Sequence, residues 1–124
     1  MKAVYIAGPY RASNAWKVER NVRAAEEVAM LVAEAGAAPL CPHTMFRYFD
    51  GTLNDDFWLK ATLELLRRCD AIVMLPTWRS SSGARGEHGD ALSRNLPILD
   101  LCETHGKGIE LFVHDLEAQD HDQG

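Results

Sequence analysis

A short glycine- and serine-rich stretch, Ser80 to Ala91, holds the residues best suited to chemistry. It follows a strand-like run at residues 71–75 and opens a predicted helix. Glycines let a backbone approach a ligand closely, and the free N–H groups of a helix N-terminus favour an anion. The candidate binding residues are Ser81, Ser82, Gly83 and Arg85, and the candidate catalytic group is the carboxylate of Glu87 in the first helical turn. The alternative is a turn that only caps a helix, with Glu87 stabilising its positive end.

A second turn with binding potential follows the first predicted strand. Residues 2–7 form a β-branched and aromatic run that stops at Gly8 and Pro9. Tyr10 and Arg11 come next, so this turn offers an aromatic ring and a cation. Trp78 stands just before the glycine-rich stretch and is the tryptophan whose loop we expect to face the same ligand.

The elements that must position these turns alternate along the chain. Helices are predicted after cap residues Ser13 or Asn14, after Asn54, and from the glycine-rich stretch to about Asn95. Strands are predicted at residues 2–7, 37–41, 71–75, 97–101 and 108–113. This alternation predicts an α/β fold, a flavodoxin/Rossmann-like three-layer sandwich with a parallel sheet of four to five strands. Ligands bind such folds beyond the carboxyl ends of the strands, so the turns after strands one and three should share a crevice.

The composition of the chain argues against several classes of protein. The 124 residues have a formal net charge of −5, which argues against a general nucleic-acid-binding surface. No apolar run is long enough to span a membrane, and the N-terminus lacks a signal-peptide pattern. Cys41, Cys69 and Cys102 form no metal or disulfide pattern, which favours a reducing, cytoplasmic location. We predict one domain, residues 1–114, followed by a polar, frayed tail at residues 115–124, with no metal site and no cofactor.

The two turns and the residues before the third strand resemble the nucleoside 2-deoxyribosyltransferase-like superfamily. The resemblance rests on residues 4–11, 69–71 and 81–91 and spans roughly residues 2–101. Within this superfamily, the chain is similar above all to a branch of small bacterial and phage proteins and to the deoxynucleoside 5′-monophosphate N-hydrolases. The resemblance implies a small-molecule nucleoside or nucleotide substrate, no cofactor, and a homodimer or higher homo-oligomer.

The resemblance also assigns roles to individual residues. Glu87 matches the nucleophile that attacks C1′ of the sugar, and Tyr5 matches the tyrosine that orients that carboxylate. Ser81 and Arg11 match residues of the nucleotide hydrolases, which favours a 5′-monophosphate as the substrate. The physical chemistry agrees, because a carboxylate can stabilise and trap the cationic sugar that forms when an N-glycosidic bond breaks.

One position departs from the family pattern. Thr62 stands eight residues before Asp70, where the superfamily usually has its catalytic acid. A threonine cannot protonate a leaving base, so a non-catalytic nucleotide-binding or sensor module on the same fold is the alternative function. A phosphoribohydrolase is a third possibility and ranks lower, because Gly83 to Glu87 departs from that family's glycine pattern.

Overall fold

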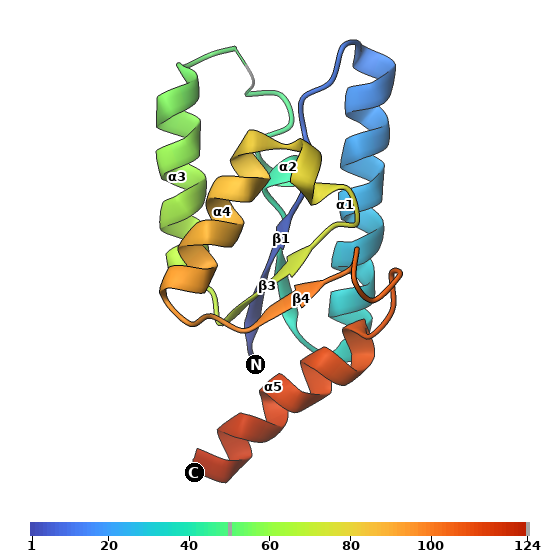
Figure 1. Cartoon of the computed structure of the whole chain (residues 1–124), viewed down its shortest axis with the longest axis vertical. Coiled ribbons are helices and arrows are strands. Elements are labelled where there is room, and N and C mark those ends of the chain that lie inside the picture. Colours follow the sequence, from blue (N-terminus) through green and yellow to red (C-terminus); the bar gives the residue numbers. More distant parts are fainter. Residues whose placement is uncertain (50, 124) are drawn as a thin grey trace.

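The chain forms a four-stranded sheet flanked by helices (Figure 1). The computed structural model describes residues 1–49 and 51–123, with side chains as far as residue 119. The elements in chain order are β1 (Ala3–Ala7), α1 (Ala15–Ala35), β2 (Ala38–Leu40), α2 (Pro42–Met45), α3 (Asp55–Arg67), β3 (Ala71–Met74), the short 3-10 helix η1 (Trp78–Ser80), α4 (Ser82–Ser93), β4 (Ile98–Asp100) and α5 (Ile109–Gln123).

The sheet is entirely parallel, with the strand order β2-β1-β3-β4. β1 pairs with β3 in the centre, where Tyr5 lies opposite Ile72 and Ala7 opposite Met74. The chain leaves these neighbouring strands towards α1 and α4, so a crevice opens at their carboxyl ends. The predicted flavodoxin/Rossmann-like α/β sandwich is confirmed, and the turns after strands one and three do lie side by side.

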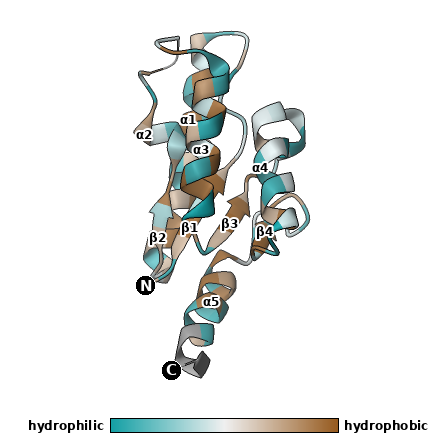
Figure 2. Cartoon of the chain, turned by 90° about the vertical axis from the view of Figure 1, so that its left-hand side faces the viewer, coloured by the Kyte–Doolittle hydropathy of each residue, from teal (hydrophilic) through white to brown (hydrophobic). Residues whose placement is uncertain are grey.

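Alternation along β1 divides the hydrophobic core into two layers. Val4 and Ile6 belong to the layer that packs under α1 and α5, while Tyr5 and Ala7 belong to the layer under α3 and α4. Successive side chains of a strand point to opposite faces, so this division follows from the strand itself. Figure 2 shows the hydrophobic residues concentrated on β3, as expected for a parallel strand covered on both faces. Tyr5 therefore shares a face with α4 and its Glu87.

Two of the predicted N-cap residues do cap their helices. The Asn14 side chain accepts a hydrogen bond from the Lys17 amide, and the Asn54 side chain accepts one from the Phe57 amide. Gly36 ends α1 with φ +107°, a left-handed conformation that glycine adopts without strain.

The predicted fifth strand at residues 108–113 is wrong, because this segment begins α5. Ile109, Val113 and Leu116 are buried at helical spacing, and the helix continues through the segment predicted as a tail. A short helix, α2, follows β2 directly and begins at Pro42. Among the described helices, none is long and apolar enough to cross a membrane.

Candidate functional site

A crevice of about 560 Å³ lies at the carboxyl ends of β1 and β3. The β1–α1 turn, α2, the N-terminal half of α3 and the start of α4 line it. Of the sequence-predicted site residues, the crevice contains Tyr5, Gly8, Pro9, Tyr10, Arg11, Ser81, Ser82, Gly83 and Glu87. Residues up to 82 positions apart in the sequence are thus brought to one cavity by the parallel sheet.

Glu87 lies in the crevice wall formed by α4, with only 9% of its surface exposed. Burial raises its pKa to about 7, while the Tyr5 hydroxyl lowers it. A carboxyl group with this pKa exists in both protonation states near neutral pH, and perturbed pKa values of this kind are concentrated at functional sites.

Tyr5 places its hydroxyl in the same cavity. The ring is 1% exposed, and burial raises the pKa of the hydroxyl, with further contributions from the Glu87 carboxylate. The hydroxyl lies close enough to Glu87 and Thr62 to interact with both electrostatically, yet no hydrogen bond of ordinary length and angle satisfies it among the described residues. An unsatisfied buried hydroxyl beside a buried carboxyl indicates a place where a ligand completes the hydrogen bonding.

Gly8 is required by the close approach of two strand ends. A Cβ atom at this position would lie 2.3 Å from Leu75 Cδ1 and 2.7 Å from Leu75 Cβ. The turn after β1 therefore passes directly against the end of β3. This contact places Pro9 and Tyr10 beside the loop that precedes α4.

The serine-rich loop forms one end of the crevice. Ser81 is the N-cap of α4, and its Oγ accepts a hydrogen bond from the Ala84 amide at 3.1 Å. Ser82 and Gly83 in the first turn also line the cavity. The loop is therefore both a helix cap and a cavity wall.

Arg11 forms a two-pronged ion pair with Asp55 across the crevice mouth. Its Nη1 donates to Asp55 Oδ2 at 2.8 Å, and its Nη2 binds Asp55 Oδ1. The guanidinium holds the pKa of Asp55 below its ordinary value. Asp56 lies next to this pair and lines the same cavity. The described lining residues therefore include three carboxyl groups and one arginine.

Aromatic side chains build the wall opposite the serine loop. The rings of Phe46 and Trp58 lie 5.2 Å apart between centroids, and the His43 ring meets Tyr10 edge-on at 5.9 Å. His43 Nε2 donates to the Pro9 carbonyl at 2.9 Å, and burial lowers the pKa of this histidine, so the ring is neutral at neutral pH. The atoms His43 Nδ1 and Trp58 Nε1 are buried and without a partner among the described residues.

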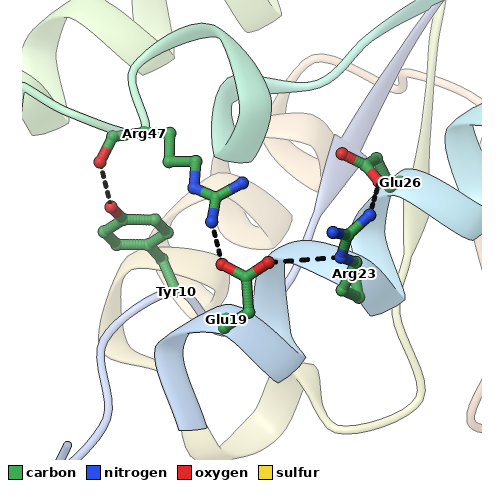
Figure 3. Close-up of polar contacts among 5 residues, drawn as sticks. All are labelled: Tyr10, Glu19, Arg23, Glu26 and Arg47. Atoms are coloured by element: carbon green, nitrogen blue, oxygen red, sulfur yellow. Dashed lines mark hydrogen bonds and ion pairs between the residues drawn. The ribbon is translucent and has the colours of Figure 1, made fainter. Parts of the chain in front are cut away.

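A polar network holds the Tyr10 side of this wall in place (Figure 3). The Tyr10 hydroxyl donates to the Arg47 carbonyl at 2.7 Å, and the Arg47 guanidinium binds Glu19 on α1. Arg23 then joins Glu19 to Glu26, each at 3.2 Å. The network ties the segment after α2 to the first half of α1, and so fixes the β1–α1 turn from outside.

Two predicted binding residues, Trp78 and Arg85, lie outside the crevice. Trp78 belongs to η1, where its Nε1 donates to Asp100 at 3.0 Å and its ring stacks on His88 at 4.2 Å. The turn of η1 directs the indole towards the end of β4, away from the cavity. Arg85 donates to the Arg79 carbonyl at 2.7 Å. The expected contact of Trp78 with substrate is therefore replaced by a structural contact.

Apart from Tyr10, the residues of the aromatic wall are not among the predicted site residues. His43, Phe46 and Trp58 line the crevice, as do Asp55 and Asp56. The α3 residues could have been found from their spacing, because positions 55, 58, 59 and 62 fall on one face of a helix. The direction of that face depends on packing against the sheet, which the local sequence does not specify. Among the described residues, no group of His, Cys, Asp and Glu side chains is arranged to hold a metal ion.

Comparison with known sequences finds one family. Residues 2–101 match the family described as Domain of unknown function (DUF7768). This range includes every strand and every crevice-lining residue, and it ends before α5. A search of curated proteins gives no significant match.

Proposed function

Because the chain belongs to the DUF7768 family, whose function is unknown, we propose an activity from the crevice: cleavage of the base–sugar bond of a nucleoside or its 5′-monophosphate. The observation that carries this proposal is that a buried Glu87 carboxyl lies beside the Tyr5 hydroxyl, which has no well-formed hydrogen bond among the described residues. The resemblance to the nucleoside 2-deoxyribosyltransferase-like superfamily assigns the same two residues as nucleophile and orienting group.

The reaction would follow the double displacement of retaining glycosidases. A Glu87 carboxylate oxygen attacks C1′, and the electron pair of the breaking C1′–N bond leaves with the base. The sugar is then bound to Glu87 as an ester. Water attacks C1′ in the second step, releasing the sugar and restoring the carboxylate, and the proton that the water loses passes to the departed base or to solvent. Attack by a second base would give transfer instead. The pKa of about 7 leaves a substantial carboxylate fraction at neutral pH.

The remaining crevice residues suit the other parts of such a substrate. The serine loop and the N-terminus of α4 offer hydroxyl and N–H donors to a sugar or a phosphate. Phe46, Trp58 and Tyr10 offer aromatic surface to a planar base. Arg11 is the cation that a 5′-phosphate would bind, in exchange for Asp55.

The alternative, a nucleotide-binding module without activity, predicts a Glu87 committed to an ion pair. The two arginines of the predicted site are engaged elsewhere, Arg11 with Asp55 and Arg85 with the Arg79 carbonyl. Burial and Tyr5 set the pKa of Glu87. These contacts favour the enzyme over the binding module.

The proposal includes self-association in the cytoplasm. Large hydrophobic side chains are exposed near the crevice mouth, among them Tyr48 at 81%, Leu53 at 52% and Phe57 at 47%. A second copy of the chain that covers these residues would also restrict access of water to the crevice. Sedimentation equilibrium measures the oligomeric state directly, and a monomer at all concentrations would contradict this part of the proposal.

The decisive experiment is base release from a panel of nucleosides, 2′-deoxynucleosides and their 5′-monophosphates. We expect release by the wild-type protein and loss of at least about 10³-fold in Glu87→Gln, since the nucleophile is removed. A 2′-fluoro substrate that slows the second step should leave a sugar adduct on Glu87, detected by mass spectrometry of the intact protein. Release that persists in Glu87→Gln would contradict the mechanism, and binding without release would favour the module.

A further inference from the structure

Three of the four buried side-chain polar atoms that lack a partner in the described residues belong to this one crevice. They are Tyr5 Oη, His43 Nδ1 and Trp58 Nε1, and the Tyr5 and His43 side chains are 1% and 6% exposed. Buried polar groups are normally satisfied, so the concentration of such side chains around one cavity marks it as a candidate binding site. The charge and the proton donors of the same walls then define the chemistry of that ligand.

The crevice has an excess of negative charge. Its charged lining residues in the described chain are Arg11, Asp55, Asp56 and Glu87. Because Arg11 is bound by Asp55 through both of its terminal nitrogens, its charge is locally neutralised. The carboxyl groups of Asp56 and Glu87 are then the described lining groups whose negative charge is not compensated. When Glu87 is protonated, the charge of Asp56 still makes the cavity negative. A substrate group with positive charge is favoured by this balance.

Among the residues that the structure describes, the crevice also lacks a proton donor next to Glu87. Thr62 and Tyr5 are the neighbours on the crevice floor, and burial raises the pKa of the Tyr5 hydroxyl, which makes it a poor acid. His43 is neutral because burial lowers its pKa. Asp55 is held as a carboxylate by Arg11. Asp56 stands six residues before Thr62 on α3, about 9 Å further along the helix axis towards the mouth.

A neutral base leaves as an anion unless it is protonated, and that protonation is usually worth about 10²- to 10⁴-fold in rate. A base that already carries a positive charge through alkylation of its ring needs no proton. Its nitrogen takes the electron pair of the C1′–N bond and the base leaves as a neutral molecule. A crevice with a nucleophile, no adjacent acid and a negative, aromatic wall is matched to this leaving group.

We propose that the substrate is a cationic nucleoside, with a quaternised purine or a pyridinium ring as its base, which Phe46, Trp58 and the carboxylate of Asp56 bind opposite Glu87. This inference rests on the proposed N-glycosidase function and names its substrate class. It assigns Trp58 and Asp56 as specificity-determining residues and explains the threonine at position 62 as an adaptation rather than a lost activity.

The first test compares substrates that differ by one charge. We expect 7-methyladenosine and nicotinamide riboside to be cleaved at least about 10²-fold faster than adenosine and uridine, after division by the spontaneous rates. Thr62→Asp places an acid beside Tyr5 and Glu87, and should raise the rate for adenosine relative to the rate for 7-methyladenosine. Equal normalised rates for both classes, or a ratio that Thr62→Asp does not change, would overturn the inference while leaving the glycosidase function in place.

The second test needs no turnover. Quenching of tryptophan fluorescence should report binding of 1-methylnicotinamide, a cation, at least about fivefold tighter than binding of neutral nicotinamide. Trp58→Leu and Asp56→Asn should each reduce this preference, whereas Asp115→Asn on the distant α5 should not. If no nucleoside is cleaved, the proposed function fails, and this measurement still decides the binding preference. Equal binding of the two probes, or binding of neither, would overturn the inference.

Discussion

The Tyr5 hydroxyl and the Glu87 carboxyl lie beside each other in the crevice and shift each other's pKa in opposite directions. Burial raises the pKa of both groups. In addition, the hydroxyl lowers the pKa of Glu87, while the carboxylate raises that of Tyr5. The hydroxyl thus preserves the nucleophilic form of a carboxylate that burial alone would protonate further.

The rate of base release should increase with pH and level off above about pH 7, because the carboxylate form of Glu87 is the nucleophile. Tyr5→Phe removes the group that lowers the Glu87 pKa, so the inflection should move to higher pH. The pH dependence of kcat/KM for both proteins measures this. An inflection near 4.5, the ordinary value of a glutamate, would show that Glu87 is solvated.

Glu87 should destabilise the folded protein at high pH. Its pKa is raised from 4.5 to about 7, so the folded state binds this proton more tightly than the unfolded state. The resulting stabilisation is full below pH 4.5 and is lost as the pH rises through 7. The glutamine side chain of the Glu87→Gln variant cannot ionise, so the variant does not lose this stabilisation. As the pH rises through this range, its free energy of unfolding minus that of the wild type should increase by as much as about 3 kcal/mol. Urea denaturation at several pH values tests this, and a difference that is independent of pH would contradict it.

Asp55→Asn should shift the preference of the enzyme towards 5′-monophosphates. The substitution removes one negative charge and the ion pair between Arg11 and Asp55, so Asp55 no longer competes with a phosphate for Arg11. Since the pair is exposed, we expect the ratio of kcat/KM for a monophosphate to that for its nucleoside to rise only about two- to fivefold. Asp56→Asn makes the same change of charge, keeps the ion pair between Arg11 and Asp55, and is the matched control. An equal rise in both variants would indicate a general charge effect.

Gly8→Ala should destabilise the fold by about 1–3 kcal/mol, because its Cβ would lie within 2.8 Å of three Leu75 atoms. Gly86→Ala is the matched control, since a Cβ there meets no atom within 4 Å and the residue lies inside α4. The control should be stabilised by about 0.5–1 kcal/mol. Thermal denaturation of both variants, and of Gly8→Ala combined with Leu75→Ala, gives the comparison. The double variant should recover part of the loss, and purely additive effects would exclude the contact.

The alternation of strands and helices was sufficient to predict the sheet, because each strand ends at a clear turn residue. The segment from Gly108 was assigned to the wrong element, because a short apolar run can be a strand or the start of a helix. Its helical period becomes visible only when Leu116 is included with Ile109 and Val113, and Leu116 lies in the part predicted as a polar tail.

The crevice-lining residues that follow the ends of strands could be predicted from the sequence. Those whose position depends on how a helix packs were harder to predict. Tyr5 and Glu87 meet because β1 and β3 are neighbours and because strand residues alternate between faces. The positions of Trp58 and Trp78 depend on how α3 and η1 pack against distant elements. The indole of Trp78 has an acceptor in Asp100, 22 residues later in the chain, and local sequence does not reveal such a partner.

Helix α5 packs at the end of the sheet opposite the crevice, where Glu117 accepts a hydrogen bond from the Lys2 amide. It extends away from the domain and carries the C-terminus with it (Figure 1). A sensor chip or bead attached at the C-terminus would therefore hold each molecule with its crevice towards the solution. Such uniform orientation would let the weak binding of small nucleosides be measured on an immobilised protein, without a chemical label near the site.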